Sequence, residues 1–232
     1  MEEKIRVAID GPAGAGKSSV ARAVAQAFSI AYLDTGAMYR ALGLKALKQG
    51  VGTGDEEAVG RLAADTHITV AASNGDQRIY LDGRDVTGAI RTEAVSRAAS
   101  DVSRFPAVRR RMVELQQAVA RESSVVMDGR DIGTHVMPFA DCKIYLTATA
   151  DERARRRHRD LLKRGTPVEF ETLLQQINER DRQDTSREYA PLRQAEDAVF
   201  IDTTHMGESA VIERVIAIIK EKLQAKGVSW TR

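Results

Sequence analysis

Residues 11–18 form a glycine-rich segment that ends in a lysine and a hydroxyl side chain. The segment, Gly11-Pro-Ala-Gly-Ala-Gly16-Lys17-Ser18, matches the pattern G-x-x-x-x-G-K-[ST]. In such a loop, backbone N–H groups bind phosphate oxygens, the lysine approaches the β- and γ-phosphates, and the hydroxyl is placed to coordinate Mg²⁺. A strand pattern precedes it at 5–10 and a helix pattern follows at 17–28, which is the required context. We therefore expect an ATP site formed by Gly11, Pro12, Ala13, Gly14, Ala15, Gly16, Lys17, Ser18 and Ser19.

Phosphate loops of this kind occur in kinases, in switch GTPases and in motor ATPases. Guanine-reading GTPases usually carry [NT]-K-x-D late in the chain, and this sequence has no such stretch. At 232 residues, the chain also lacks the long second half of ring-forming ATPases. These two absences favour a kinase that acts on a small molecule.

The composition is that of a soluble globular protein, with 43% hydrophobic and 29% charged residues. A net charge of +2 is too close to neutral to favour nucleic acid or an acidic membrane as a partner. The sequence has no signal-peptide pattern and no apolar run near the roughly 18 residues of a membrane span. Cys142 is the only cysteine, so one chain forms no internal disulfide. We expect a cytoplasmic protein without zinc, because the four histidines share no ligand spacing.

Short apolar segments alternate mostly with helical ones, a pattern typical of α/β proteins whose parallel sheet is covered by helices on both faces. The five expected strands are 5–10, 31–33, 124–127, 143–146 and 199–201. The expected helices are 17–28, 35–49, 91–121 with a break before Pro106, and 208–224. Residues 53–90 differ, because two alternating segments, 67–71 and 78–81, flank the turn Asn74-Gly75, which indicates a small β-containing insert.

Asp128 comes directly after an apolar strand segment, 125–127. P-loop enzymes usually place a second carboxylate near Mg²⁺ at this point. Asp128 can also cap the turn Asp128-Gly129, and the two roles do not exclude each other. We therefore treat it as a candidate for the surroundings of the metal rather than as an assigned ligand.

Residues 151–164 are unusually basic and contain Arg153, Arg155, Arg156, Arg157, Arg159, Lys163 and Arg164. A basic helix is often a solvated face or a nucleic-acid patch. In a small kinase it also fits a lid that closes over ATP and excludes water, with Gly165-Thr-Pro167 as its end. We favour the lid, and the sequence does not indicate which arginine contacts a phosphate.

Several motifs follow the phosphate loop in a fixed order. They are Asp34-Thr-Gly-Ala-Met-Tyr-Arg40, Ala98-Ala-Ser100, Phe105-Pro-Ala-Val-Arg109, Asp128-Gly-Arg-Asp-Ile-Gly133, Glu179-Arg-Asp-Arg-Gln-Asp-Thr-Ser-Arg187 and Ala190-Pro-Leu192. With this order and spacing, essentially the whole chain resembles the bacterial-type cytidylate kinases. The resemblance implies that the γ-phosphoryl group of ATP is transferred, with Mg²⁺, to CMP or dCMP. One departure is Lys17-Ser18-Ser19, where many members have Lys-Gly-Thr; Ser18 keeps a hydroxyl, although the metal ligand can differ.

The resemblance also assigns roles to individual side chains. It implies that Arg40 and Arg130 bind the acceptor phosphate and that Arg180 and Asp184 contact the pentose. The residues that it places around the cytosine are Thr35, Ser100, Arg109, Asp131 and Arg187. Lys17, Arg130 and Asp131 are the expected catalytic residues. A monophosphate adds close to two negative charges to a site that already holds a triphosphate, and the bidentate fork of arginine is suited to aligning such oxyanions.

We expect a single kinase domain over residues 1–232, with its active site built from one chain and acting as a monomer. Its core would consist of 1–52, 91–150 and 196–232, with a monophosphate-binding insert at about 53–90 and a lid at about 151–165. Two alternatives remain open at this point. One is a P-loop kinase of another small acceptor, such as UMP or shikimate, and the other is an ATP-binding sensor without transfer activity. The cluster of arginines favours the enzyme, because a sensor does not need to bind an acceptor phosphate.

The phosphate loop makes a direct prediction for Lys17→Ala. The purified variant should fold and yet transfer phosphate at least about 10²-fold more slowly, because the lysine charge stabilises the transition state and not the core. Steady-state rates at saturating ATP, together with circular dichroism as a control for folding, test this. Wild-type turnover in the folded variant would contradict the assignment of the loop.

Overall fold

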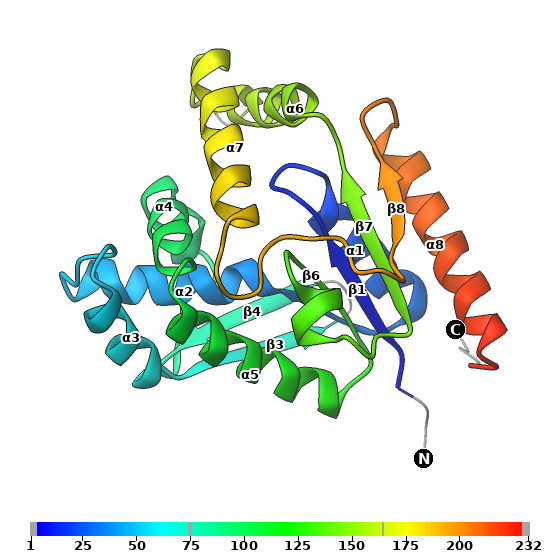
Figure 1. Cartoon of the computed structure of the whole chain (residues 1–232), viewed down its shortest axis with the longest axis horizontal. Coiled ribbons are helices and arrows are strands. Elements are labelled where there is room, and N and C mark those ends of the chain that lie inside the picture. Colours follow the sequence, from blue (N-terminus) through cyan, green and yellow to red (C-terminus); the bar gives the residue numbers. More distant parts are fainter. Residues whose placement is uncertain (1–3, 74–75, 164, 229–232) are drawn as a thin grey trace.

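A parallel sheet of five strands forms the centre of the computed structural model, which describes residues 4–73, 76–163 and 165–228. The strands lie in the order β2-β6-β1-β7-β8 (Figure 1). Their bounds are β1 Arg6–Asp10, β2 Ala31–Asp34, β6 Val125–Gly129, β7 Cys142–Thr147 and β8 Val199–Asp202. Each strand ends within two residues of the expected range, so the predicted α/β fold with a parallel sheet is confirmed.

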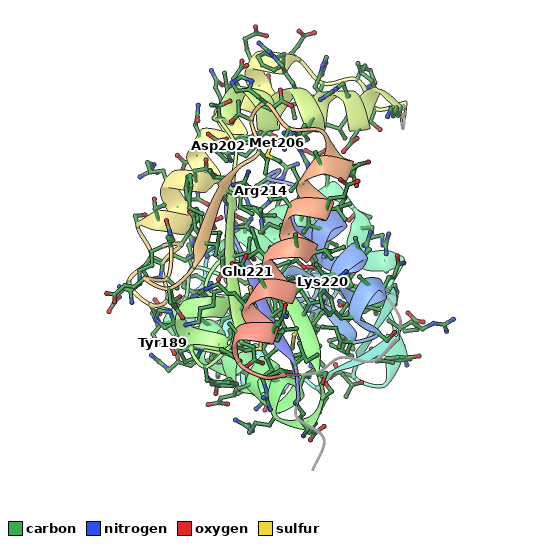
Figure 2. The ribbon with its side chains drawn as sticks, turned by 90° about the vertical axis from the view of Figure 1, so that its right-hand side faces the viewer. Tyr189, Asp202, Met206, Arg214, Lys220 and Glu221 are labelled. Carbon is green, nitrogen blue, oxygen red and sulfur yellow. The ribbon has the colours of Figure 1, made fainter. Side chains whose placement is uncertain are left out.

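Helices cover both faces of this sheet. On one face, α1 (Lys17–Phe28) and α8 (Glu208–Ala225) bury their apolar residues against the outward side chains of β1 and β7. On the other face, α2 (Thr35–Lys48) and α5 (Pro106–Glu122) belong to the second apolar cluster. Central strands such as β1 are apolar on both sides, because successive side chains point to opposite faces. Figure 2 shows the outer surface of α8, where Arg214, Lys220 and Glu221 are exposed.

The segment expected to be helical over 91–121 forms two main helices. A short 3-10 turn at Ala89–Arg91 leads into α4 (Glu93–Val102), and α5 follows with Pro106 in its first turn. Proline suits this position because the first N–H groups of a helix have no partner within it. The expected break before Pro106 is therefore confirmed. No helix in the described part of the chain is both long and apolar enough to span a membrane.

A second sheet, small and antiparallel, lies within residues 53–90. Its strands are β3 (Ile68–Ser73), β4 (Asp76–Leu81) and β5 (Arg84–Asp85), so both expected strands are confirmed and β5 is additional. The turn Asn74-Gly75 lies outside the described residues. Helix α3 (Glu56–Ala64), which the sequence analysis does not predict, precedes this sheet. Gln77 on β4 exchanges two hydrogen bonds with the backbone of Asp34, at 2.6 and 3.2 Å, and so connects the small sheet to the end of β2.

Two further helices, α6 (Ala150–Lys163) and α7 (Phe170–Thr185), stand above the main sheet (Figure 1). The expected lid at about 151–165 coincides with α6, and Arg164 lies outside the described residues. Helix α7 is not predicted from the sequence. It packs against α6, and Ser100 on α4 donates a hydrogen bond to Gln183 on α7 at 3.4 Å.

Three aspartates meet at one edge of the main sheet. Strands β1, β2 and β6 are parallel and in register, with Asp34 opposite Asp128 and Asp10 opposite Gly129. Their carboxyl ends therefore lie side by side. In open α/β sheets, ligands bind in the crevice beyond the carboxyl ends of the strands, so a ligand site is expected at this edge.

Candidate active site

The loop at 11–16 joins β1 directly to the N-terminus of α1. Gly11 has a φ angle of 146°, and a Cβ atom there would lie 1.9 Å from the carbonyl oxygen of Leu146 on β7. Only glycine fits this close approach of two backbones. At the other end of the loop, Gly16 precedes α1 with a φ angle of 87°, and no side chain caps the helix. The first N–H groups of α1 are thus left to bind an anion.

Lys17 is buried at the start of α1, where its Nζ donates a hydrogen bond to the carbonyl of Pro12 at 2.7 Å. Burial lowers the pKa of Lys17, and the nearby charge of Arg130 lowers it further, while Asp128 opposes the shift. A buried ammonium group without a directly bonded carboxylate is electrostatically unfavourable by itself. Phosphate oxygens bound in the loop would relieve this, because they bring negative charge to Nζ.

Ser18 and Asp128 form a hydrogen-bonded pair below the loop. The Ser18 hydroxyl donates to Asp128 Oδ2 at 2.8 Å, and the Tyr32 hydroxyl donates to Oδ1 at 3.1 Å. Burial and the charge of Asp34 raise the pKa of Asp128 to about 6, although Lys17 opposes the shift. The Ser18 hydroxyl and the Asp128 carboxylate, which the sequence motifs connect to Mg²⁺ independently of each other, therefore lie together at the phosphate loop.

Arg130 and Arg187 share one buried carboxylate, Asp184. Arg130 Nε lies 2.6 Å from Asp184 Oδ2, and Arg187 is bound to Oδ1 of the same side chain. Arg187 also donates to the Ser103 hydroxyl at 3.0 Å. Burial would raise the pKa of Asp184, but the charges of Arg130, Arg187 and Arg180 outweigh it and hold the pKa at about 2. The three side chains thus form a permanently charged cluster at the base of α7.

Arg109 and Asp131 form a second buried pair. Arg109 Nη2 lies 2.8 Å from Asp131 Oδ2, and their side chains are 2% and 7% exposed. Arg109 Nη1 donates to the Ser103 carbonyl at 3.3 Å, and the guanidinium lies 5.6 Å from the centre of the Tyr39 ring. Arg109 Nε, Arg109 Nη2 and Asp131 Oδ2 have no well-aligned hydrogen bond within the described residues. The pair therefore places a donor side chain and an acceptor side chain next to each other, held mainly by their opposite charges.

Asp10 holds the segment that carries Arg130 and Asp131. Its carboxylate accepts the backbone N–H groups of Ile132 at 2.8 Å and Gly133 at 2.7 Å, at the start of a π-helical turn, Ile132–Val136. Burial raises the pKa of Asp10 to about 7, although these two hydrogen bonds oppose the shift. The sequence analysis missed this residue. An acidic side chain between an apolar strand and the first glycine of a phosphate loop is the signal that could have indicated it.

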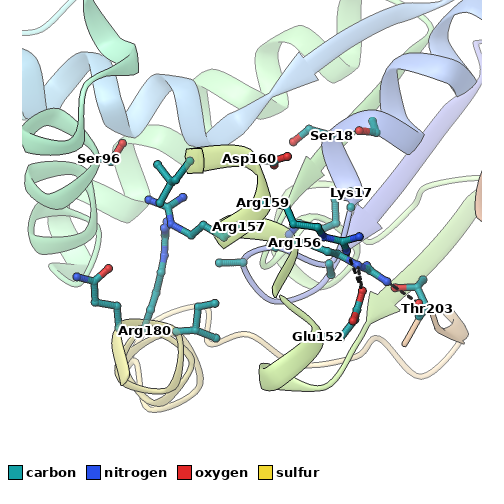
Figure 3. Close-up of a pocket in the computed structure, with 18 of the residues that line it drawn as sticks. Lys17, Ser18, Ser96, Glu152, Arg156, Arg157, Arg159, Asp160, Arg180 and Thr203 are labelled. Carbon is teal, nitrogen blue, oxygen red and sulfur yellow. Dashed lines mark hydrogen bonds and ion pairs between the residues drawn. The ribbon is translucent and has the colours of Figure 1, made fainter. Parts of the chain in front are cut away.

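A cavity of about 1140 Å³ lies above the phosphate loop, between α4, α6, α7 and the start of α8. Arg180 lines it and is half-buried, and its buried Nε has no hydrogen-bond partner among the described residues. Burial lowers the pKa of Arg180 to about 10, and the charge of Arg130 contributes to the shift. Arg157, on α6, points toward Arg180 across the cavity (Figure 3), and within the described residues Arg157 forms no ion pair. Asp184 also acts on the charge of Arg180, but among the described residues neither Arg157 nor Arg180 forms an ion pair with a carboxylate. The space between these two cations therefore favours an anion.

The remaining predicted residues divide into two groups. Of the expected acceptor-binding residues, Ser100 and Arg180 line the cavity, together with residues 13–19 of the phosphate loop. The others lie beside it, in pairs of their own. Arg40 forms an ion pair with Asp34 at 2.6 Å, and the Thr35 hydroxyl donates to the Asp128 carbonyl at 2.8 Å. The described residues contain no group of three or more histidine, cysteine, aspartate or glutamate side chains that could hold a metal ion by themselves.

Comparison with known proteins agrees with this geometry. The family model for cytidylate kinase matches residues 7–221. A cytidylate kinase from Geobacillus kaustophilus is 51% identical over 96% of this chain and 100% of its own, and one from Bacillus subtilis is 46% identical over 96% and 99%. The chain belongs to the cytidylate kinase family. Among solved structures, an uncharacterised protein from Eubacterium ventriosum has a TM-score of 0.51 and covers 94% of this chain and 99% of its own. Its identity of 13% shows a similar fold and no more.

The charged cluster of Arg130, Asp184 and Arg187 should contribute to the stability of the fold, and a substitution of Asp184 tests this. Its pKa in the folded chain, about 2, lies below the ordinary 3.8, so the carboxylate stabilises the fold above pH 3.8. That stabilisation is lost as the pH falls through about 2. Asp184→Asn should therefore lower the free energy of unfolding at pH 7 by about 2 kcal/mol or more.

Urea unfolding of Asp184→Asn and wild type between pH 7 and pH 3 measures this effect. The difference between the two proteins should stay constant down to about pH 4 and shrink below it. Asp151→Asn is a matched control, because Asp151 forms an ion pair with Arg155 in which both side chains are exposed, at 48% and 63%. A difference for Asp184→Asn that is as small as that of the control would contradict the assignment of the cluster.

Proposed function

We propose that this protein transfers the γ-phosphoryl group of ATP to CMP and dCMP and so forms CDP and dCDP. The observation that carries the proposal is the unpaired Arg180, which faces Arg157 above the phosphate loop. Membership of the cytidylate kinase family supports the choice of reaction. The two cations are suited to the phosphoryl group in transit, which carries negative charge on its peripheral oxygens.

The donor and acceptor sites are proposed to share Arg130. Lys17 and the N–H groups of the loop would bind the phosphates of ATP, while Arg40 and Arg130 would bind the phosphate of the acceptor. The charge of Arg130 lowers the pKa of Lys17, so the two cations act on one another electrostatically. Asp184 would contact the pentose. Arg180, for which the resemblance implies a contact with the pentose, is proposed here to bind the phosphoryl group. Positioned charges of this kind lower the barrier without having to reorient during transfer.

Mg²⁺ fits the residues at the foot of the loop. The Ser18 hydroxyl is the proposed protein ligand, and Asp128, hydrogen-bonded to it at 2.8 Å, would orient it or hold a metal-bound water. Mg²⁺ in kinases is held by one or two protein oxygens together with substrate phosphates, so the donor set needs no further carboxylates. When bound, the metal ion supplies neutralisation of the charge on the β- and γ-phosphates.

The same proposal assigns roles to the parts of the chain. The core is 1–52, 91–150 and 196–232, and residues at about 53–90 act as the monophosphate-binding insert. The lid is about 151–165, and α7 extends it because α6 and α7 pack together. Arg157 is the lid arginine proposed to contact the phosphate in transit, since Arg153, Arg155, Arg156 and Arg159 are each paired with a carboxylate. Only small-molecule substrates are proposed as partners, and the enzyme is proposed to act as a monomer.

Arg109 and Asp131 are the proposed readers of cytosine, together with Thr35, Ser100 and Arg187. Cytosine presents an amino donor at N4 beside acceptors at N3 and O2, whereas uracil presents an acceptor at O4 and a donor at N3. Asp131 and Arg109, ion-paired at 2.8 Å, place an acceptor side chain next to a donor side chain, which complements cytosine. Uracil would place O4 against the carboxylate, and shikimate has no such edge.

Initial rates of ADP release with CMP, dCMP and UMP, in wild type and in Asp131→Ala, test both the function and the base reading. Wild type should prefer CMP and dCMP over UMP by a factor on the order of 10⁴ in kcat/KM. In Asp131→Ala the CMP-to-UMP ratio should fall by about 10- to 100-fold, because one charged hydrogen bond is lost.

Asp131→Asn sharpens this comparison. Its amide can donate to O4 of uracil, so the ratio should fall through improved use of UMP as well as through weaker use of CMP. An unchanged ratio in both variants would place the base reader elsewhere. ATP binding without ADP release for any acceptor would instead support the sensor.

A further inference from the structure

Arg153 is the one arginine of α6 whose side chain is almost fully buried, at 5% exposure, within the described residues. It does not line the cavity. Its Nε donates to the Ala148 carbonyl at 2.9 Å, and its Nη1 donates to the Ala13 carbonyl at 3.1 Å and to Asp181 Oδ1 at 3.0 Å. A single guanidinium therefore bonds to the end of β7, to the phosphate loop and to α7.

The contact with the phosphate loop is close. A Cβ atom on Gly14 would lie 3.2 Å from the Cβ of Arg153, so the loop backbone packs directly on this side chain. The carbonyl of Ala13 and the N–H of Gly14 belong to the same peptide group. A cationic donor on the carbonyl polarises that peptide and strengthens its N–H as a donor to phosphate. Arg153 thus influences phosphate binding at the loop through the Ala13–Gly14 peptide group, without contacting the nucleotide itself.

The contact with Asp181 reaches the acceptor side. Asp181 lies on α7 between Arg180, which lines the cavity, and Asp184, which binds Arg130 and Arg187. A carboxylate bound by both terminal nitrogens of an arginine fixes the orientation of the helix that carries it. The position of α7, and with it the acceptor residues, is in this way tied to the phosphate loop.

A pair that only joins α6 to α7 would explain part of this arrangement. Such a hairpin contact would need the Arg153–Asp181 ion pair and nothing else. It does not account for the hydrogen bond to Ala13 or for the packing on Gly14, since Ala13 lies 140 positions away in the sequence and belongs to neither helix. The contact with the phosphate loop therefore shows that Arg153 connects the loop to α7 and does not only join the two helices.

We propose that Arg153 and Asp181 are positioning residues that couple the two substrate sites, so that binding of the donor nucleotide strengthens binding of the acceptor. A nucleotide bound in the loop fixes the backbone of Ala13 and Gly14. Arg153, bonded to Ala13, then holds Asp181 and with it α7 in one position. In that position α7 presents Arg180 and Asp184 to the acceptor. The inference rests on the proposed function for the identity of the two ligands. The coupling is reciprocal, so CMP strengthens binding of the donor by the same factor.

The test is the dissociation constant of CMP, measured by calorimetry with and without saturating Mg²⁺ and a non-hydrolysable ATP analogue. In wild type the analogue should tighten CMP binding by a factor within the usual range of about 5- to 150-fold. In Asp181→Asn and in Arg153→Lys this factor should fall to about 1. The single nitrogen of a lysine ammonium cannot span the acceptors that the three nitrogens of Arg153 reach. The double variant should show no further loss, since both changes break one link.

Arg182→Gln is the matched control. Arg182 is adjacent to Asp181 on α7 and forms an exposed ion pair with Glu179, with 71% of its side chain exposed, so its loss should leave the coupling factor unchanged. Asp181 is 25% exposed, and its asparagine variant should fold, which a thermal melt verifies.

Two results would overturn the proposal: no coupling in wild type, or wild-type coupling in Asp181→Asn, whether or not that variant has a lower melting temperature. Failure of wild type to bind CMP under any condition would remove the proposed function, and this inference with it. Coupling that fails while CMP still binds overturns this inference alone.

Discussion

The site depends on arginines that outnumber the carboxylates bound to them at one edge of the sheet. Within the described residues, Arg109 pairs with Asp131, and Arg130 and Arg187 share Asp184, while Arg180 has no carboxylate. Burying an unpaired cation costs free energy unless a partner arrives. The lowered pKa values of Lys17 and Arg180 are the electrostatic sign of this imbalance. An anionic ligand would therefore supply the negative charge that these cations lack in the free protein.

The parallel sheet brings carboxylates to the same edge as these arginines. Because β1, β2 and β6 end at the same edge, Asp10, Asp34 and Asp128 each hold a piece of the site in place. Asp10 fixes the turn after Arg130 and Asp131, Asp34 holds Arg40, and Asp128 holds Ser18. The acidic groups hold backbone and side chains in position, while the cations above them remain for the ligands.

Local patterns explain why much of this could be predicted from the sequence. The strands and the phosphate loop depend on neighbouring residues, and the loop motif specifies its own backbone, as the close approach of Gly11 to Leu146 shows. Helix α7 was missed although Phe170, Leu173, Leu174 and Ile177 have helical spacing, because residues 178–185 are all polar or charged and do not continue the apolar stripe. The pairs Arg109–Asp131 and Arg153–Asp181 join residues 22 and 28 positions apart through tertiary contacts that no sequence spacing encodes. Resemblance to a family gave the acceptor residues their roles, but not their partners.

The central claim, that the surplus of arginines over the carboxylates bound to them exists for an acceptor phosphate, is tested most directly by comparing CMP with cytidine. The two ligands share base and pentose and differ only in the phosphate. Calorimetry on wild type at physiological salt should show CMP binding at least about 100-fold more tightly, because two or more charge-assisted hydrogen bonds are gained. Cytidine binding within tenfold of CMP would mean that the arginines hold the fold together and do not bind the acceptor, and would contradict the account.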